Sequence, residues 1–428
     1  MREMKDSGVA WIGKIPKDWG VVPHKRVMHK VKEICEQYNG EDIISLTMNG
    51  VIKRDLTAGG KMPTSFDGYQ YVKPNDLLLC LFDIDVTPRC VGVVKDCGVT
   101  SPAYSRFIMH DGYYNAYYDY LLRAIDDDKV FVHLSKNLRS SLTESDFGAI
   151  KTCVPPLAEQ ERIATFLDAE CAEIDAVLEK TRASIEEYKK LKQAVITQAV
   201  TKGIRGDRPM KDSGIAWIGE VPEDWEISSV RYIGRLQNGI SKGGEFFGTG
   251  FPFVSYGDVY KNYKLPHSVS GLIDTNEDER AIYSVEYGDI FFTRTSETIE
   301  EVGFSCVCKN SIPNATFAGF VIRLRPFCAD EKILTDYAKY YFRGEHIRAY
   351  LVKGMNLVTR ASLGQTLLKG MSVTVPPKSV QKAIAEYLDA KCTEINRLIA
   401  AKQQLLTELE NYKKSLIYEY VTGKKEAV

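Results

Sequence analysis

The sequence lacks the features of exported, membrane-spanning and metal-binding proteins. No apolar run approaches the about 18 residues that a membrane helix needs, and the opening MREMKDSGVAWIGKIPKDW contains no signal-peptide core. The ten cysteines form no C-x-x-C pair, and the six histidines form neither H-x-x-x-H nor H-E-x-x-H. We therefore expect a cytoplasmic protein with reduced thiols, no membrane partner and no bound metal.

The sequence also has no excess of either charge. Its net charge is −1, from 56 Lys and Arg against 57 Asp and Glu, which excludes a protein coated in basic residues. Any nucleic-acid surface must then be a local patch. With 428 residues, of which 44% are hydrophobic, the chain is long enough for two or three domains with cores of their own.

The clearest feature that is present is an internal duplication. The segment MKDSGVAWIGKIPKDW from Met4 returns as MKDSGIAWIGEVPEDW from Met210, an offset of 210 − 4 = 206. A second block, VPPLAEQERIATFLDAE from Val154, matches VPPKSVQKAIAEYLDAK from Val375 at 375 − 154 = 221. The second copy is therefore 15 residues longer between the two blocks.

Between these blocks the two copies share only short phrases. Residues 75–79 (NDLLL) parallel residues 288–292 (GDIFF), and residues 91–93 (VGV) are aligned with residues 302–304 (VGF). The loops between the phrases differ completely. A shared framework with divergent loops is what we expect of a scaffold that carries two different recognition surfaces.

No complete active-site motif occurs in either copy. Residues 8–15 nearly spell a P-loop, but Ile15 stands where a hydroxyl is required, and the duplicate has Glu220 after Gly219. Residues 247–250 (FGTG) faintly resemble a glycine-rich S-adenosylmethionine turn, without the surrounding strand-turn-helix pattern. No G-x-S-x-G is present. We therefore predict a protein that is not an enzyme.

Two segments free of Gly and Pro predict long helices, from Pro156 to Gly203 and from Pro377 to Gly423. Alternating steps of four and three along each segment predict a coiled-coil seam, with polar residues at matching places in both copies. A two-fold relation between the copies makes the helices antiparallel and places Val421 and Thr422 near Met4. Plain packing accounts for the seam positions, whose apolar members are Ile174, Leu178, Ile185, Tyr188, Val195, Ile395, Ile399, Leu406, Leu409 and Leu416.

These motifs together resemble the specificity subunit of bacterial type I restriction-modification enzymes, and the resemblance covers essentially the whole chain. It rests on the Trp-Ile-Gly-x-x-Pro-x-x-Trp openings and on the Pro-Pro-x-x-x-Gln blocks that lead to Ile-Ala-x-Φ-Leu-Asp. It also rests on the helices that end in Val-Thr, and on residues 288–299 and 101–104, which are similar to phrases of the family's target-recognition domains.

The resemblance implies an α+β fold with two pseudo-two-fold-related target-recognition domains joined by two long antiparallel coiled-coil helices. The domains would be residues 1–153 and 204–374, and the helical spacers residues 154–203 and 375–428. In the family, each domain reads one half of a bipartite, asymmetric DNA target, and the helices set the gap. The helices also dock two modification subunits, through which restriction subunits join; S-adenosylmethionine, ATP and Mg²⁺ are expected on those partners.

The divergent loops supply candidates for DNA contact. Arg and Lys suit guanine, Asn and Gln suit adenine, and hydroxyls with further basic residues suit phosphates. We rank Arg294 first; the alternative for it is an ion pair with Glu297 or Glu300. Arg139 and Arg360 are duplicated, which favours phosphate contact or a structural anchor. The other candidates are Thr293, Thr295 and Ser296 in the second domain and Thr87, Arg89, Ser101 and Tyr104 in the first.

One alternative from another class stays open at this point. A coiled-coil interaction scaffold with no DNA role fits the nearly neutral domains. A gel shift with the modification subunit present separates the two, because a scaffold leaves DNA of any sequence unshifted.

Overall fold

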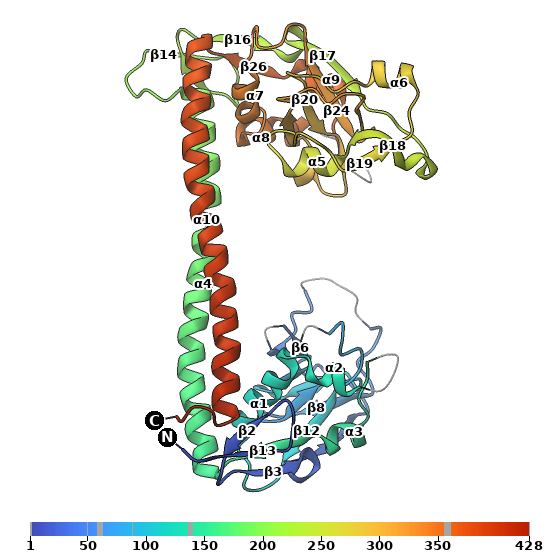
Figure 1. Ribbon diagram of the computed structural model, residues 1–428, viewed down its shortest axis with the longest axis vertical. Helices are drawn as coiled ribbons and strands as arrows, with labels where there is room; N and C mark the ends of the chain where they lie inside the picture. The colour runs from blue at the N-terminus through green and yellow to red at the C-terminus, as the bar shows by residue number, and fades with distance from the viewer. Residues whose placement is uncertain are drawn as a thin grey trace. The chain divides into compact units, whose positions relative to one another are not determined.

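The computed structural model describes residues 2–48, 50–57, 63–87, 89–135, 140–354 and 361–427. The chain forms two compact units, unit 1 (Met1–Arg182 with Gln404–Val428) and unit 2 (Ala183–Gln403). Each unit joins a globular part of mixed helix and strand to segments of the two long helices, α4 (Leu157–Lys202) and α10 (Lys378–Val421) (Figure 1). The mixed α and β content agrees with the prediction.

The core of each globular part is an antiparallel four-stranded sheet of the same topology. The order is β10-β9-β12-β4 in unit 1 and β22-β20-β24-β17 in unit 2. Buried apolar residues of these strands face the helices α1 (Asn115–Asp127) and α7 (Thr335–Tyr341). The strands are β4 (Met28–Val31), β9 (Leu77–Leu79), β10 (Val91–Val93), β12 (Ser105–Met109), β17 (Gly234–Asn238), β20 (Ile290–Thr293), β22 (Ser305–Val307) and β24 (Val321–Pro326).

The strand register corrects one detail of the sequence comparison. Val91 pairs with Leu79 in unit 1, and Ser305 pairs with Phe292 in unit 2, so β10 corresponds to residues 305–307 and not to residues 302–304. A short 3-10 helix, Ile299–Glu301, lies in the loop that precedes this strand of unit 2, and residues 302–304 stand between the helix and the strand.

Smaller sheets complete each unit. Unit 2 has the longer hairpin and two short helices in the region where its sequence is longer. In unit 1 these elements are β1 (Met4–Asp6), β2 (Lys14–Pro16), β3 (Gly20–Pro23), β5 (Ile34–Cys35), β6 (Ile44–Thr47), β7 (Gly50–Lys53), β8 (Tyr69–Val72), β11 (Gly98–Thr100), β13 (Lys151–Val154), α2 (Val130–Leu134) and α3 (Glu144–Ala149). In unit 2 they are β14 (Met210–Asp212), β15 (Glu220–Pro222), β16 (Glu226–Ser229), β18 (Phe247–Val254), β19 (Gly271–Ile273), β23 (Thr316–Phe317), β26 (Ser372–Val375), α5 (Tyr256–Lys261), α6 (Glu277–Ile282), α8 (Glu345–Gly354) and α9 (Gln365–Gly370).

Tyrosines dock the globular parts onto the long helices in the same way in both units. Tyr120 donates to Asp168 at 2.7 Å in unit 1, and Tyr340 donates to Asp389 at 2.7 Å in unit 2. The carbonyl of Val421 accepts a hydrogen bond from Tyr117 at 2.8 Å. In unit 2, Tyr337 donates to the Val200 carbonyl at 3.2 Å. The final Asp of the Ile-Ala-x-Φ-Leu-Asp motif and the Val of the Val-Thr helix end are therefore docking residues.

The glutamine of each Pro-Pro-x-x-x-Gln motif joins the start of a long helix to the globular part. Gln160 accepts a hydrogen bond from the backbone N–H of Tyr114, just before α1, at 2.8 Å. Its amide donates to the Pro155 carbonyl at 2.9 Å. Gln381 repeats this geometry with the N–H of Leu334, just before α7, at 2.7 Å. Both glutamines are buried, so each motif fixes a helix junction.

Within each unit the two long helices pack against each other in antiparallel fashion. In unit 1, Lys413 pairs with Asp175 at 2.6 Å, and Arg182 pairs with Glu410 at 2.7 Å, so residue numbers rise along one helix as they fall along the other. In unit 2, Lys192 donates to Asn396 at 2.9 Å. The predicted antiparallel helices are confirmed, and their seam residues are buried or half-buried.

The C-terminal segment lies against the N-terminal hairpin of unit 1. Tyr418 donates to the Trp11 carbonyl at 3.0 Å, and Lys424 donates to the Ile12 carbonyl at 2.9 Å. A side chain on Gly423, which has φ +68°, would collide with Pro16. The adjacency of the two ends of the chain, expected from the duplication, is confirmed.

A buried glutamate holds the N-terminal tryptophan in unit 1 but has no counterpart in unit 2. Trp19 donates from Nε1 to Glu159 at 3.0 Å, and Arg2 binds the same carboxylate. At the offset of 221 the equivalent of Glu159 is Val380, and the buried Trp225 Nε1 has no hydrogen-bond partner among the described residues. The duplicated Trp is therefore anchored by a polar contact in one unit only.

We expect Glu159→Val, which copies unit 2 into unit 1, to lower the free energy of unfolding by about 1–3 kcal/mol, because it leaves the buried indole N–H of Trp19 unpaired. Glu161→Val, the same change at an exposed position of α4, is the matched control and should alter stability by about 0.5 kcal/mol or less. Urea unfolding monitored by tryptophan fluorescence measures both variants. Equal effects would show that the contact contributes nothing.

No helix among the described residues is long and apolar enough to cross a membrane. The same residues contain no group of three or more His, Cys, Asp or Glu side chains arranged to hold a metal ion. Cys306 and Cys308 lie two residues apart and are both buried in one apolar cluster of unit 2.

Candidate nucleic-acid interface

The divergent loops of each unit lie at the same end of the four-stranded sheet, where strands begin or finish; this end of the sheet is called the edge below. In unit 2 this edge is formed by the end of β20, the end of β17 and the start of β24. The segment 361–365 lies beside it, because Leu363 N donates to the Arg294 carbonyl at 2.8 Å. Unit 1 repeats this bond from Leu142 N to the Leu81 carbonyl at 2.8 Å. The edge therefore belongs to the shared framework, while the side chains on it differ.

Arg294 is held at this edge by its backbone. Its N–H donates to the Phe320 carbonyl at 2.8 Å, and its half-buried guanidinium donates to the Gly319 carbonyl at 3.3 Å. Arg294 forms no ion pair with any described side chain, and the expected pair with Glu297 is therefore absent. The side chain of Glu300, the other expected partner, is not among those described. A guanidinium with one neutral acceptor keeps most of its donors for another molecule.

The hydroxyl residues beside Arg294 differ in their availability. Thr293 is fully buried; its Oγ1 donates to the Glu301 carbonyl at 3.0 Å and accepts from the Phe304 N–H at 2.9 Å. The assignment of Thr293 to DNA contact is therefore wrong, because the hydroxyl is occupied within the fold. Ser296 donates to the Glu301 carboxylate. Thr295 is half-exposed, opposite Ser362 in the β21–β25 pair (Thr295–Ser296 with Ala361–Ser362), with the hydroxyls 3.4 Å apart.

The equivalent loop of unit 1 directs its arginine elsewhere. Arg89 donates from Nε to the Val91 carbonyl at 2.8 Å, and its guanidinium lies beside Gly50. It lines a cleft of about 780 Å³ together with residues of α1 and of both long helices. Burial lowers the pKa of Arg89. Thr87 donates to the Asp83 carbonyl at 2.8 Å, which closes the loop.

Ser101 and Tyr104 lie in the turn that precedes β12, at the same edge of the unit 1 sheet. Their carbonyls accept hydrogen bonds from the Gln70 amide, at 3.1 and 2.7 Å respectively. The Tyr104 ring is half-buried, and burial raises the pKa of its hydroxyl. The buried Gln70 therefore fixes this turn. Arg139 and Arg360, the duplicated candidates, lie outside the described residues.

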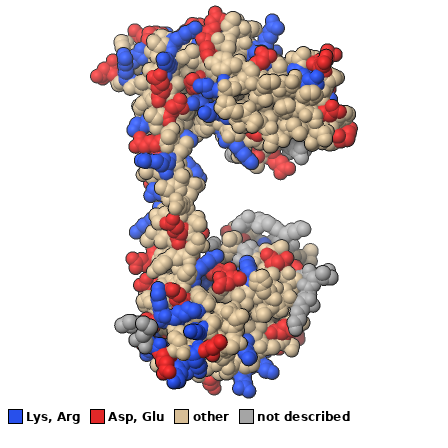
Figure 2. Space-filling view, viewed as in Figure 1, with Lys and Arg blue, Asp and Glu red and all other residues tan. Residues whose placement is uncertain are grey.

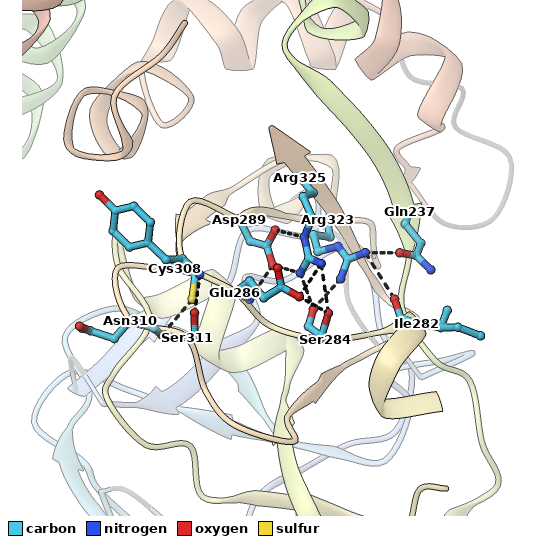
Figure 3. Close-up of polar contacts among 11 residues, drawn as sticks. Gln237, Ile282, Ser284, Glu286, Asp289, Cys308, Asn310, Ser311, Arg323 and Arg325 are labelled. Atoms are coloured by element: carbon cyan, nitrogen blue, oxygen red, sulfur yellow. Dashed lines mark hydrogen bonds and ion pairs between the residues drawn. The ribbon is translucent and has the colours of Figure 1, made fainter. Parts of the chain in front are cut away.

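A buried arginine, Arg323, and a half-buried one, Arg325, support the sheet behind the edge in unit 2. Arg325 makes a two-point ion pair with Asp289, at 2.7 and 2.6 Å, and also contacts Glu286 at 2.8 Å. Arg323 donates to Gln237 and to the Ser284 carbonyl, so both guanidinium groups share one polar cluster (Figure 3). Burial raises the pKa of Asp289, although Arg325 opposes the shift. Asp289 belongs to the duplicated phrase 288–292.

Unit 1 has a simpler version of this cluster. Asp76, the equivalent of Asp289, pairs with the buried Arg106 at 2.6 Å. The duplicated aspartates thus form structural ion pairs, Asp76 with Arg106 and Asp289 with Arg325, that hold the central strands. They are not available to DNA.

The seam residues of the long helices contact the facing helix within each unit. Ile174, Leu178 and Ile185 are buried on α4, and Ile395 and Leu416 are buried on α10. Their positions agree with plain packing, and their role in partner docking stays a prediction.

On the face drawn in Figure 2, both globular parts carry Lys and Arg as well as Asp and Glu, separated by uncharged areas. This pattern agrees with the net charge of −1 and with recognition through individual side chains.

The sequence comparison missed two amides at the unit 2 edge. Gln365, the first residue of α9, donates from Nε2 to Asn238 Oδ1, at the end of β17, at 2.9 Å. Their residue types alone made them candidates, because Asn and Gln are the side chains that pair with adenine. These two residues are 127 positions apart, however, and only the folded chain brings them together.

Comparison with known proteins agrees with the predicted resemblance. The chain is 23% identical over 443 residues to a putative type I restriction enzyme MjaX specificity subunit of Methanocaldococcus jannaschii, covering 96% of this chain and 95% of the relative. It is 21% identical to the EcoKI specificity subunit of Escherichia coli K12, covering 97% and 91%. No protein-family model matches the chain.

Solved structures agree on the fold. A chain from a study of complex assembly and conformational transition in a type I R-M system superposes with a TM-score of 0.71 at 14% identity, covering 96% of this chain and 99% of that one. The HsdS subunit of Thermoanaerobacter tengcongensis gives 0.50 at 14% identity, covering 96% and 98%. Over nearly its whole length the chain is similar to type I specificity subunits.

Proposed function

We propose that this chain is the non-catalytic, DNA-reading specificity subunit of a type I restriction-modification complex. The similarity to named specificity subunits supports the class. The observation that carries the proposal is the repeated edge, where one backbone framework presents different side chains in the two units. A duplicated enzyme site would require the opposite pattern, with the same chemical groups kept in both copies.

Each unit would read one half of a bipartite, asymmetric target. The edge of unit 2 offers a guanidinium, hydroxyls and amides, whereas the edge of unit 1 offers the turn at Ser101 and Tyr104. Different donor and acceptor sets select different bases, so two unlike edges predict two unlike half-sites. The helical segments would set the gap between the half-sites.

The repeated N-terminal hairpins support a partner present in two copies. The Met4 and Met210 segments differ at only four positions, and the identical Asp6, Gly8 and Ala10 are exposed, as are Asp212, Gly214 and Ala216. Turn geometry accounts for the aspartates and glycines, because Asp6 and Asp212 accept from the N–H of Gly8 and Gly214 and both glycines have positive φ, but it does not require identity at the exposed alanines. We propose that these surfaces and the adjoining helices bind two modification subunits, which carry S-adenosylmethionine, while restriction subunits with ATP and Mg²⁺ join through them.

Sequencing of modified bases in the native host genome tests this function. We expect a two-part asymmetric motif that is modified on both strands and disappears when this chain is deleted. A gel shift of the chain with its modification subunit should then select duplexes that carry the motif. A scaffold without a DNA role predicts neither a lost motif nor a shifted duplex, and that result would overturn the proposal.

Arg294→Ala should weaken binding of the cognate duplex by about 1–3 kcal/mol and relax selectivity in one half-site, because a guanidinium can donate to both major-groove acceptors of guanine. Competition binding with duplexes altered one base pair at a time measures both effects. Lys261→Ala, which removes an exposed charge on α5, is the control. If Arg294→Ala weakens random and cognate DNA equally, Arg294 contacts a phosphate.

A further inference from the structure

The amide pair of Gln365 and Asn238 lies beside Arg294 on the edge of unit 2. Asn238 ends β17, and the next residue, Gly239, donates its N–H to the Val321 carbonyl at 3.1 Å. Gln365 follows Leu363, which is bonded to the Arg294 carbonyl. The segment of Asn238 is thus bonded to Val321, the segment of Arg294 to Phe320, and the segment of Gln365 to Arg294, so backbone hydrogen bonds connect the three segments.

The backbone beneath the pair is packed too tightly to move freely. A Cβ on Gly239 would lie 2.2 Å from the Ala318 carbonyl oxygen, and one on Gly319 would lie 2.2 Å from Ser241 Oγ. Glycine is thus required at position 239, where a side chain would collide with backbone atoms, whereas at position 319 it would collide with the Ser241 hydroxyl. This packing fixes Asn238 at the end of its strand, and Asn238 in turn orients the Gln365 amide.

The pair has a defined set of remaining hydrogen-bonding groups. Gln365 Nε2 uses one of its two hydrogens on Asn238 Oδ1, so the Gln365 amide keeps one N–H donor beside its Oε1 acceptor, and Asn238 Nδ2 keeps two hydrogens. Among the described residues the structure records no other partner for either amide. The Gln365 amide therefore presents one donor and one acceptor side by side on one group, and Asn238 orients it.

We infer that this amide pair reads an adenine in the half-site recognised by unit 2. In the major groove adenine presents the N7 acceptor beside the N6 donor, which complements one donor and one acceptor held side by side. Guanine presents two acceptors there and would leave the amide oxygen facing an acceptor. The inference rests on the proposed DNA-reading function and assigns the specificity of one position within it.

The test uses the full chain in complex with its modification subunit. A pool of randomised duplexes first yields the motif selected by the wild-type complex. Each adenine of that motif is then replaced in turn by 7-deazaadenine, which keeps the N6 amino group but lacks the N7 acceptor. We expect the wild-type complex to lose about 5-fold or more in affinity at one adenine.

Variants connect that position to the pair. Gln365→Leu and Asn238→Leu should each weaken cognate binding by about 5- to 150-fold and remove the penalty of 7-deazaadenine at the same position. Thr366→Val, at the neighbouring exposed residue of α9, is the matched control and should keep the wild-type profile. The 7-deazaadenine series on the wild-type protein does not depend on the variants folding.

The outcomes separate this inference from the proposed function. If the wild-type complex selects a motif but no adenine position responds to both 7-deazaadenine and the leucine variants, the reading of adenine by this pair is wrong while the function stands. If the wild-type complex selects no motif at all, the proposed function itself is overturned.

Discussion

Replacing Asp289 with alanine is expected to lower the free energy of unfolding of the protein by about 2–3 kcal/mol, because it removes the buried carboxylate that accepts two hydrogen bonds from the half-buried guanidinium of Arg325. Asp289 is 0% exposed and accepts two hydrogen bonds from Arg325 and one from the Glu286 N–H at 2.8 Å. Guanidinium chloride unfolding followed by circular dichroism measures the loss.

The control for this variant uses the other carboxylate on the same arginine. Glu286 pairs with Arg325 at 2.8 Å but is 54% exposed, so Glu286→Ala should cost at most about 1 kcal/mol. A similar loss for both variants would show that burial does not strengthen the Asp289 pair. Asp289→Asn, which keeps the shape and one acceptor, should fall between them.

The protein is expected to lose about 2–3 kcal/mol of stability for each of two buried histidines between pH 7 and pH 4.5. Burial lowers the pKa of His24 to about 4 and that of His346 to about 4, against 6.5 in the unfolded chain. Above pH 6.5 each of these histidines is neutral in both the folded and the unfolded state, so the protein loses no stability there. As the pH falls through this window the unfolded state binds protons that the folded state does not, so stability falls.

Single substitutions separate the two contributions. His24→Leu and His346→Leu should each flatten the loss of stability between pH 7 and pH 4.5 by about 2–3 kcal/mol, whatever they do to stability at pH 7. His133→Gln, at an exposed position of α2, should leave the pH profile unchanged. Urea midpoints measured at half-unit pH steps decide the matter, and parallel curves for all variants would exclude these histidines as the cause.

The framework could be predicted from the sequence because duplication repeats it. The absence of Gly and Pro across residues 157–202 and 378–421 marked both long helices, and the matched ends of the helices placed Val421 against the N-terminal hairpin. Comparison of the two copies also excluded a P-loop at residues 8–15, because Glu220 follows Gly219 in the second copy. These features depend on local pattern or on the comparison of copies, and both are readable from one chain.

The edges could not be predicted because they are assembled from distant segments. Thr293 looked like a contact residue, but its hydroxyl bonds a loop that crosses back at Glu301 and Phe304. Arg89 occupies the expected loop and yet lies in the cleft beside α1. Whether a polar side chain faces solvent depends on which backbone groups reach it, and sequence alone does not supply that information.

The connection of Tyr117 to Val421 has a consequence for synthesis of the protein. The hydroxyl and the carbonyl are 304 residues apart, so at about 5–20 residues per second unit 1 waits roughly 15–60 s on the ribosome for its last helix. Unit 2, which ends at Gln403, is complete earlier. The half of the molecule that is translated first therefore completes its contacts last, and until then the Tyr117 hydroxyl of α1 lacks the Val421 carbonyl.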